Sequence, residues 1–537
     1  MKSARLLRSD MFRACAGYGL GVLALVAGTA AQANSVAPAV CDDATFLRRA
    51  SLDLVGRQPA PTQIAAFLAD PAPDKRSALI ERLLTDPAWA TNWARYFRDV
   101  ILYRRSDERA IAMAPAVEAF FKGHLQHKAA WDDIARDVIT ASGVPSEHGE
   151  TAIIMAQMGE TADIAAEVSR IFTGVQIQCA QCHDHFSDRW KRNQFHEFAA
   201  FFPRIAIRRG PGEGLDRFEV VSFDRDPRRG RSKQPDNPRR GDLEHEMPHV
   251  DDPSLPGTVM QPRFFLGGSG VPLGTPDQER RNTVAALLTS DSNPWFSRAI
   301  VHRVWTELVG DGFYEGIDDL GPDREPRSPE TLDALCQGFV ASGHDLRALF
   351  REIMMTPTYQ SASQSRADAS RAVGAVSCPQ RLRADQLFSE VLAALGTTDE
   401  SVAGRTKHNG RSEGQARRGQ FAGSRPAFNA IFGFDPSLPR DEIEGSIPQV
   451  LLLMNSPQLS QALDGDRPFT PLGRLLRDHP DDRDVADELH LRTLARHATP
   501  DELALCLEHV RETGDRTDAF EDIFWALVNS AEFIHRK

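Results

Sequence analysis

The sequence predicts a mainly α-helical protein made of two helical domains with a small β-hairpin or sheet insertion between them. Three observations support this fold class. Apolar residues recur every three or four positions in segments that begin at capping residues and end at Gly or Pro. Short β-prone runs cluster between residues 205 and 275. The hydrophobic content of 41% is that of an ordinary globular protein.

The N-terminus has the pattern of a secretory signal peptide. A positive segment, an apolar run over 16–30 and the small residues Ala31 and Ala33 follow one another, which predicts cleavage after Ala33. The apolar run is shorter than the roughly 20 residues that cross a bilayer, so an uncleaved anchor is the less favoured alternative. The positive segment contains Lys2, Arg5, Arg8 and Arg13. We therefore expect a periplasmic or cell-surface protein without a transmembrane span after cleavage.

After the signal peptide at 1–33, we expect a first helical domain over 34–204. The stretch "DDATFLRRASLDLVG" begins with Asp caps and ends at Gly56, and two similar capped stretches follow it. The next stretch, "PAWATNWARYFRDVILYR", places Pro87 in the first turn of a helix. Its aromatic residues fall on one face, which we expect to point into the core.

A β-containing segment is expected over 205–275 and a second helical domain over 276–537. The runs "RFEVVSF" and "TVMQPRFFLGG" bracket an arginine-rich stretch over 225–240, which we interpret as a solvated loop. Contact of this stretch with an anionic polymer is the alternative. The net charge of -12 argues against nucleic acid as a partner. A second loop rich in Gly and Arg, over 404–426, interrupts the later helices.

One pattern occurs near both ends of the chain. The stretch "LDLVGRQPAPTQIAAFL" from Leu52 resembles "LRTLARHATPDELALCL" from Leu491. Each predicts a helix, a turn closed by Pro and a second capped helix. Two distant copies do not make a solenoid, which needs at least three neighbouring units.

The stretch "VQIQCAQCHDHFSDRW" contains Cys179, Cys182 and His183 in the spacing that carries covalent haem in c-type cytochromes. Apolar residues before it fall on one helical stripe, and the motif would continue this stripe if the helix persists. Both thiols could then reach two haem vinyl groups while His183 ligates iron as the proximal ligand. Arg189 would be well placed to pair with a haem propionate. Candidate distal ligands are Met155, Met158, Met247, Met260, His245 and His249.

Two other interpretations of the motif remain open. Cys179, Cys182, His183 and His185 together could hold zinc, or His245 and His249 could complete a zinc site with the two cysteines. Alternatively, Cys179 and Cys182 form a disulfide or are a structural pair with no cofactor.

Four further cysteines could form two disulfides in three ways, and the sequence does not choose among these pairings. These cysteines are Cys41, Cys336, Cys378 and Cys506. No nucleophile elbow, P-loop or H-E-x-x-H motif identifies an enzyme.

Two parts of the chain resemble known families. The stretches "RIFTGVQIQCAQCHDHFSDRW" and "FHEFAAFF" resemble the planctomycete cytochrome c-like family, whose function is uncharacterised. The stretches "NPWFSRAIVHRVWTELVGDGF" and "LLLMNSPQLSQAL" resemble the planctomycete surface-protein domain that commonly follows it. The resemblance implies a secreted protein, with haem or without, often encoded beside a sulfatase-like secreted partner. Phe186 stands where that family usually has Pro.

These observations lead to two hypotheses. The first is an exported c-type monohaem protein that serves electron transfer or the redox support of a partner, with Cys179, Cys182 and His183 as the haem site. The second is a periplasmic or surface binding or scaffold protein without haem, in which the cysteine pair is a disulfide or a metal site. A third possibility, an enzyme, rests on no residue of the sequence.

Overall fold

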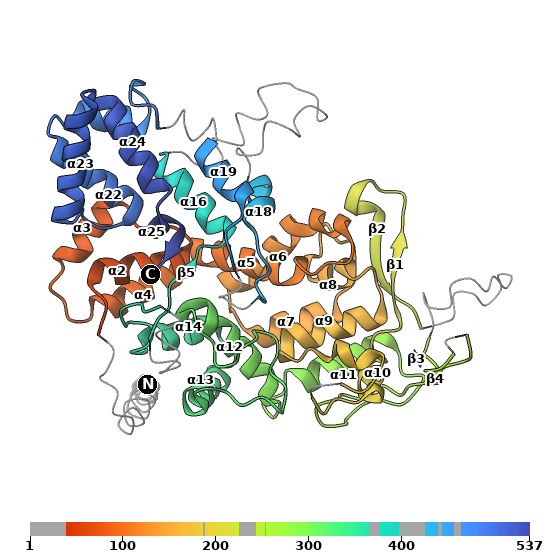
Figure 1. Ribbon diagram of the computed structural model, residues 1–537. Helices are drawn as coiled ribbons and strands as arrows, with labels where there is room; N and C mark the ends of the chain where they lie inside the picture. The colour runs from red at the N-terminus through yellow and green to blue at the C-terminus, as the bar shows by residue number, and fades with distance from the viewer. Residues whose placement is uncertain are drawn as a thin grey trace, which may run out of the picture.

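The chain folds mainly into helices, as the sequence predicts. The computed structural model describes residues 39–185, 188–224, 243–252, 254–365, 376–396, 425–438, 443–455 and 463–537. Over these residues it contains 21 α-helices and three two-stranded sheets (Figure 1). The expected signal peptide, the arginine-rich stretch 225–240 and most of the loop 404–426 lie outside the described residues.

Helix α2 begins and ends at the expected capping residues. Asp42 accepts a hydrogen bond from the Thr45 amide at the start of α2, and Gly56 ends this helix in the left-handed conformation. The helices of this part are α2 (Asp43–Val55), α3 (Pro61–Ala69), α4 (Lys75–Thr85), α5 (Pro87–Leu102), α6 (Ala114–Gln126), α7 (Trp131–Thr140), α8 (Ala152–Ala156), α9 (Thr161–Thr173) and α10 (Arg192–Ala199). The apolar faces of α2 and α5 pack together in the core.

The β insertion is small. Strand β1 (Ile205–Arg209) pairs antiparallel with β2 (Phe218–Ser222), and β3 (Glu246–Met247) pairs with β4 (Thr258–Val259). A third sheet joins distant parts of the chain, because β5 (Gln380–Arg381) pairs with β6 (His535–Arg536) at the C-terminus.

Helices resume after the insertion. They are α11 (Asp277–Leu288), α12 (Pro294–Val309), α13 (Pro329–Ala341), α14 (Leu346–Met355), α16 (Ala384–Ala394), α18 (Arg425–Phe432), α19 (Ile447–Asn455), α21 (Pro471–Asp478), α22 (Asp482–Leu494), α23 (Pro500–Thr513), α24 (Arg516–Val528) and α25 (Ala531–Ile534). Within the described ranges, no helix has both the length and the apolar character needed to cross a bilayer.

Most buried apolar residues belong to two hydrophobic clusters. The larger one contains buried residues from Cys41 to Tyr359 and also Ala495, so α11 to α14 share a core with α2 to α10. The smaller one contains α16 and the helices after it, together with Leu52 from α2. The division between them falls after Tyr359, later in the chain than residue 276.

The two similar sequence stretches adopt the same local structure and lie side by side. Gly56 after α2 and Ala495 after α22 both have positive φ angles, and Pro61 and Pro500 each begin the following helix. Helix α3 packs on α22, and both are at the same end of the molecule in Figure 1. The similarity therefore marks a contact between the two ends of the chain.

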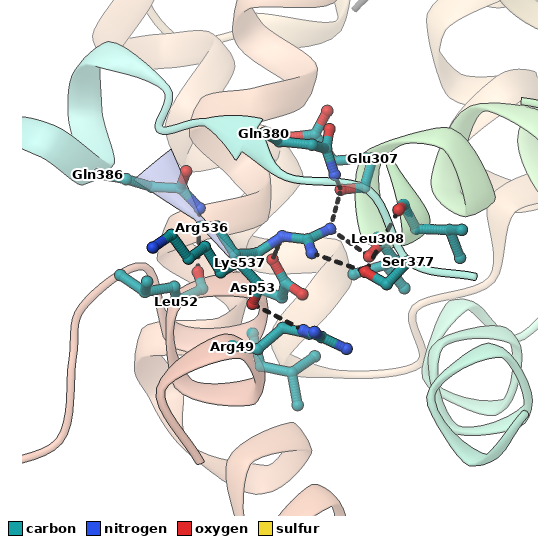
Figure 2. A network of polar contacts seen from close by, with 12 residues as sticks. Arg49, Leu52, Asp53, Glu307, Leu308, Ser377, Gln380, Gln386, Arg536 and Lys537 are labelled. Carbon is teal, nitrogen blue, oxygen red and sulfur yellow. Dashed lines mark hydrogen bonds and ion pairs between the residues drawn. The ribbon is translucent and has the colours of Figure 1, made fainter. Parts of the chain in front are cut away.

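A buried polar network joins the two clusters (Figure 2). Arg536 contacts Asp53 of α2 through Nε at 2.9 Å, and its Nη2 donates to the carbonyl of Leu308 at the end of α12. The Tyr359 hydroxyl donates to the second oxygen of Asp53 at 2.8 Å. Burial raises the pKa of Asp53 to about 6, although Arg536 and Tyr359 favour its charged form. Because these groups are removed from water, each requires its partner in place.

Replacement of Arg536 tests this network. We expect Arg536→Met to lower the free energy of unfolding by about 3–5 kcal/mol at pH 8, because the Asp53 carboxylate loses its buried counter-charge. Lys537→Met is the matched control, since the Lys537 side chain is 53% exposed and its ion pair with Glu532 spans 3.7 Å. Urea unfolding of both variants gives the comparison, and equal losses would contradict the assigned role of Arg536.

Glu390 of α16 makes stability depend on pH. It is fully buried, and its Oε1 accepts the Gln58 amide at 2.7 Å. Burial raises its pKa from 4.5 to about 7, against the opposite effect of Arg48. Between these two pH values the folded chain holds a proton that the unfolded chain has lost, so stability is greatest below the window and falls as pH rises.

We expect Glu390→Gln to remove this part of the pH dependence. The wild-type free energy of unfolding should fall by about 2–3 kcal/mol more than that of the variant as pH rises through the window. Glu508→Gln, at an exposed position of α23, should keep the wild-type slope. Urea titrations from pH 4.5 to 8 measure the slopes, and parallel curves for wild type and Glu390→Gln would refute the assignment.

Candidate functional site

Helix α9 leads to the motif but ends before it. The predicted apolar stripe is confirmed, since Ile164, Val168, Ile171 and Phe172 are all buried. The helix ends at Thr173, and Gly174 follows with a φ of 67°. A Cβ atom at Gly174 would lie 2.9 Å from the Leu320 side chain, so this position favours glycine for conformation and for space.

The motif lies on a short 3-10 helix, Ile177–Gln181, at the protein surface. Ile177 and Ala180 point into the core, whereas Cys179, Cys182 and His183 are exposed. The expectation that the α9 stripe continues through the motif is wrong, because Gly174 stops the helix and the chain changes direction. The thiols and the imidazole therefore do not face the core with α9. Both cysteines are free thiols.

A hydrogen bond orients the ring of His183. Its Nδ1 lies 2.7 Å from the backbone carbonyl oxygen of Asp184. Because a carbonyl can only accept, Nδ1 carries the proton and Nε2 is left as the atom with a free lone pair. This is the tautomer that a histidine needs in order to bind a metal through Nε2 while its other nitrogen is held by the backbone.

Helix α10 holds the motif in place. Arg192 donates its backbone N–H to Asp184 at 3.0 Å, and Lys191 reaches the other oxygen of that carboxylate at 3.0 Å. The Arg192 amide and the Lys191 ammonium lower the pKa of Asp184. The Gln181 carbonyl, inside the motif, accepts from His196 Nε2 at 2.9 Å and from Arg192 Nε at 3.3 Å. The loop is therefore tied at two points to one helix.

A second histidine, His245, supports the tie between His196 and Gln181. Since His196 donates a hydrogen bond from Nε2, its Nδ1 atom must be a hydrogen-bond acceptor. This Nδ1 atom lies 2.9 Å from His245 Nε2. Burial lowers the pKa of His196 to about 4 and that of His245 to about 3, so both rings are neutral near pH 7. No role was predicted for His196, because a lone histidine on a buried helix face has no distinguishing signal in the sequence. His245, considered as a distal ligand or zinc ligand, is instead the partner of His196.

The segment after α12 closes the other side of the loop. The Leu320 amide donates to the Gly174 carbonyl at 2.8 Å, and a Cβ atom on Gly321 would lie only 1.7 Å from Asp188 Oδ2. Burial and the neighbouring Asp323 raise the pKa of Asp188. The His185 amide donates to the Trp190 carbonyl at 2.8 Å, which closes a turn around Asp188.

The zinc alternative calls for several donor side chains close together. Among the residues that the structure describes, no group of three or more His, Cys, Asp or Glu side chains is arranged to hold a metal ion.

The candidate distal ligands of the haem lie in different surroundings. Met155 and Met260 are buried, with 8% and 7% of their surface exposed. His249 is exposed and accepts a hydrogen bond from the backbone amide of Asp252. Met158 has a positive φ angle, and Met247 lies on β3.

The remaining cysteines are buried. Cys41, Cys336 and Cys506 are free thiols, and Cys378 is also buried. Burial raises the pKa of Cys336 to about 12 and also raises that of Cys506. The Cys336 and Cys506 thiols are therefore protonated at neutral pH.

A cavity of about 560 Å³ lies beside the motif loop. Trp190, which ends the turn after His185, forms part of its wall. Neither motif cysteine lines it, and His183 does not line it either. The cavity is therefore separate from the exposed thiols.

The close approach of Gly321 to Asp188 gives a test of the loop packing. We expect Gly321→Ala to lower the free energy of unfolding by about 1–3 kcal/mol, because the new methyl group overlaps the carboxylate. Hydrogen exchange at the His185 amide should also become faster. Gly123→Ala is the matched control, since a Cβ at Gly123 meets nothing within 4 Å. Unchanged exchange and stability in Gly321→Ala would contradict the packing.

Two family models match most of the chain. Residues 23–206 match PSCyt2, a protein family of unknown function (DUF1549), and residues 280–510 match PSD1, a second family of unknown function (DUF1553). No curated protein and no solved structure matches the chain. The motif lies in the first matched region, and Gly321 lies in the second. The matches support the resemblance to two domain families expected from the sequence, PSCyt2 followed by PSD1, both of unknown function.

Proposed function

We propose that this chain is an exported c-type haem protein that exchanges electrons with a partner protein. Cys179 and Cys182 would attach the haem, as each S–H adds across one vinyl group to form a thioether, a step that needs no oxidant. His183 would be the proximal ligand through Nε2. Bound haem would supply reversible one-electron transfer at its iron.

One observation carries the proposal. The three donors of the motif are exposed together: both thiols are accessible, and the Asp184 carbonyl holds the proton of His183 on Nδ1. The ties of Gln181 and Asp184 to α10 support it further, because they fix the loop before any cofactor arrives. Exposure of the motif also suits contact with a soluble redox partner. The proposed export depends on the signal peptide.

The alternative is a binding or scaffold protein without haem. In that case Cys179 and Cys182 would be an unmodified pair or a disulfide. The two proposals differ in a single chemical property, covalent haem, which survives unfolding of the chain.

A pyridine haemochrome spectrum separates them. The full chain is expressed with a c-type maturation system and denatured before measurement. We expect a reduced c-type α-band in the wild type and none in Cys179→Ala/Cys182→Ala. Cys506→Ala, which removes a buried cysteine far along the chain, should keep the band. No band in a folded, matured wild-type sample would reject the haem proposal.

The role of His183 has its own test. In His183→Ala the thioethers should still form, so the denatured spectrum should retain the α-band. The spectrum of the native protein should change, because the iron loses its proximal ligand. His185→Ala is the matched control, because it lies two residues further and outside the motif. If the native spectrum changed in His185→Ala but not in His183→Ala, the assignment of His183 as the proximal ligand would be wrong.

A further inference from the structure

The cavity beside the motif loop is not used by the proposed haem site. Three segments far apart in the sequence form it: residues 189–194 after the motif, residues 264–269 of the insertion, and residues 287–295 between α11 and α12. Its volume of about 560 Å³ is in the usual range for small-molecule sites, roughly 300–1,000 Å³.

Aromatic rings form one part of the wall. Trp190 and Phe265 pack edge to face with ring centroids 5.2 Å apart, and both are nearly fully buried. Trp295, at the start of α12, is only partly buried. A rigid pair of buried rings and a third ring that is partly open to solvent provide flat apolar faces for another ring.

The charge of the cavity is positive. Arg189 is exposed at its wall, and in the described part of the chain no carboxylate pairs with its guanidinium. Among the described residues that line the cavity, none is an aspartate or a glutamate. The first residues of α12 also lie there, so the positive end of the helix dipole adds to the field of Arg189. In a chain with a net charge of -12, this combination favours an anionic ligand.

Small polar groups complete the wall. Ser269, Ser292 and Gln194 are among the residues that line it, and the Ser292 hydroxyl is hydrogen-bonded to that of Ser290 at 2.8 Å. Gln194 Oε1 accepts the Lys191 amide, which leaves the Nε2 group as a donor. Hydroxyl and amide groups of this kind recognise hydroxyl groups on a ligand.

We propose that this cavity binds a small ring compound that carries a carboxylate and hydroxyl groups. The ring lies against Trp295, the carboxylate pairs with Arg189, and the hydroxyl groups bond to the serine and glutamine side chains. Two sources share this chemistry, a sugar acid and a phenolic acid. The proposal does not depend on haem, because the motif thiols do not line the cavity.

Binding is measured by isothermal titration calorimetry on the full mature chain and on Cys179→Ala/Cys182→Ala, which cannot attach haem. The anionic probes are glucuronate and 4-hydroxybenzoate, and their neutral counterparts are glucose and phenol. We expect at least one acid to bind about tenfold more tightly than its neutral counterpart. This acid should bind with the same affinity to the wild-type chain and to Cys179→Ala/Cys182→Ala. The acid that binds more tightly identifies the source.

Variants of the wall locate the binding. Arg189→Gln should weaken binding of the acid about tenfold, and Ser292→Leu, which fills the cavity, should abolish it. Arg483→Gln on α22 is the matched control, since Arg483 is equally exposed and does not line the cavity. Circular dichroism checks that each variant is folded. Absence of binding by both acids, or wild-type binding by folded Arg189→Gln and Ser292→Leu, would overturn the proposal.

Discussion

The burial of charged side chains between the two hydrophobic clusters determines how the parts of the chain are arranged. Arg536 joins α2 to the end of α12, and Arg383 pairs with Glu307 at 2.9 Å in the same region. A buried charge without its partner costs several kcal/mol, roughly 3–5 when one partner is removed, so these elements have little freedom to slide. The last residues of the chain are therefore part of the structure that holds its first helix.

The same principle positions the motif. Arg170 of α9 pairs with Asp318 at 2.8 Å, and Arg303 of α12 pairs with the same carboxylate. Burial alone would raise the pKa of Asp318, but the two arginines outweigh it and hold the pKa below its usual value. This pairing brings Leu320 onto Gly174 and Gly321 onto Asp188. The second family region therefore helps to shape the loop that carries the motif of the first.

The motif loop separates two kinds of chemistry. On its exposed side are the two thiols and the oriented imidazole of the proposed haem site. On the other side, Trp190 closes a turn and forms the wall of a positive cavity. Asp188, which lies between the motif and Trp190 in the sequence, packs against Gly321.

The sequence by itself determined the helices, the β insertion over 205–275 and the motif, because periodicity, capping residues and short-range spacing are local properties. Gly174 was also a local stop signal, and its left-handed conformation explains why the α9 stripe does not continue to Cys179. Only the tertiary structure decided that α11 to α14 join the first core, that His196 and Gly321 fix the motif loop, and that three distant segments enclose a cavity. These features depend on contacts between residues far apart in the chain, and a single sequence carries no periodic signal for such contacts.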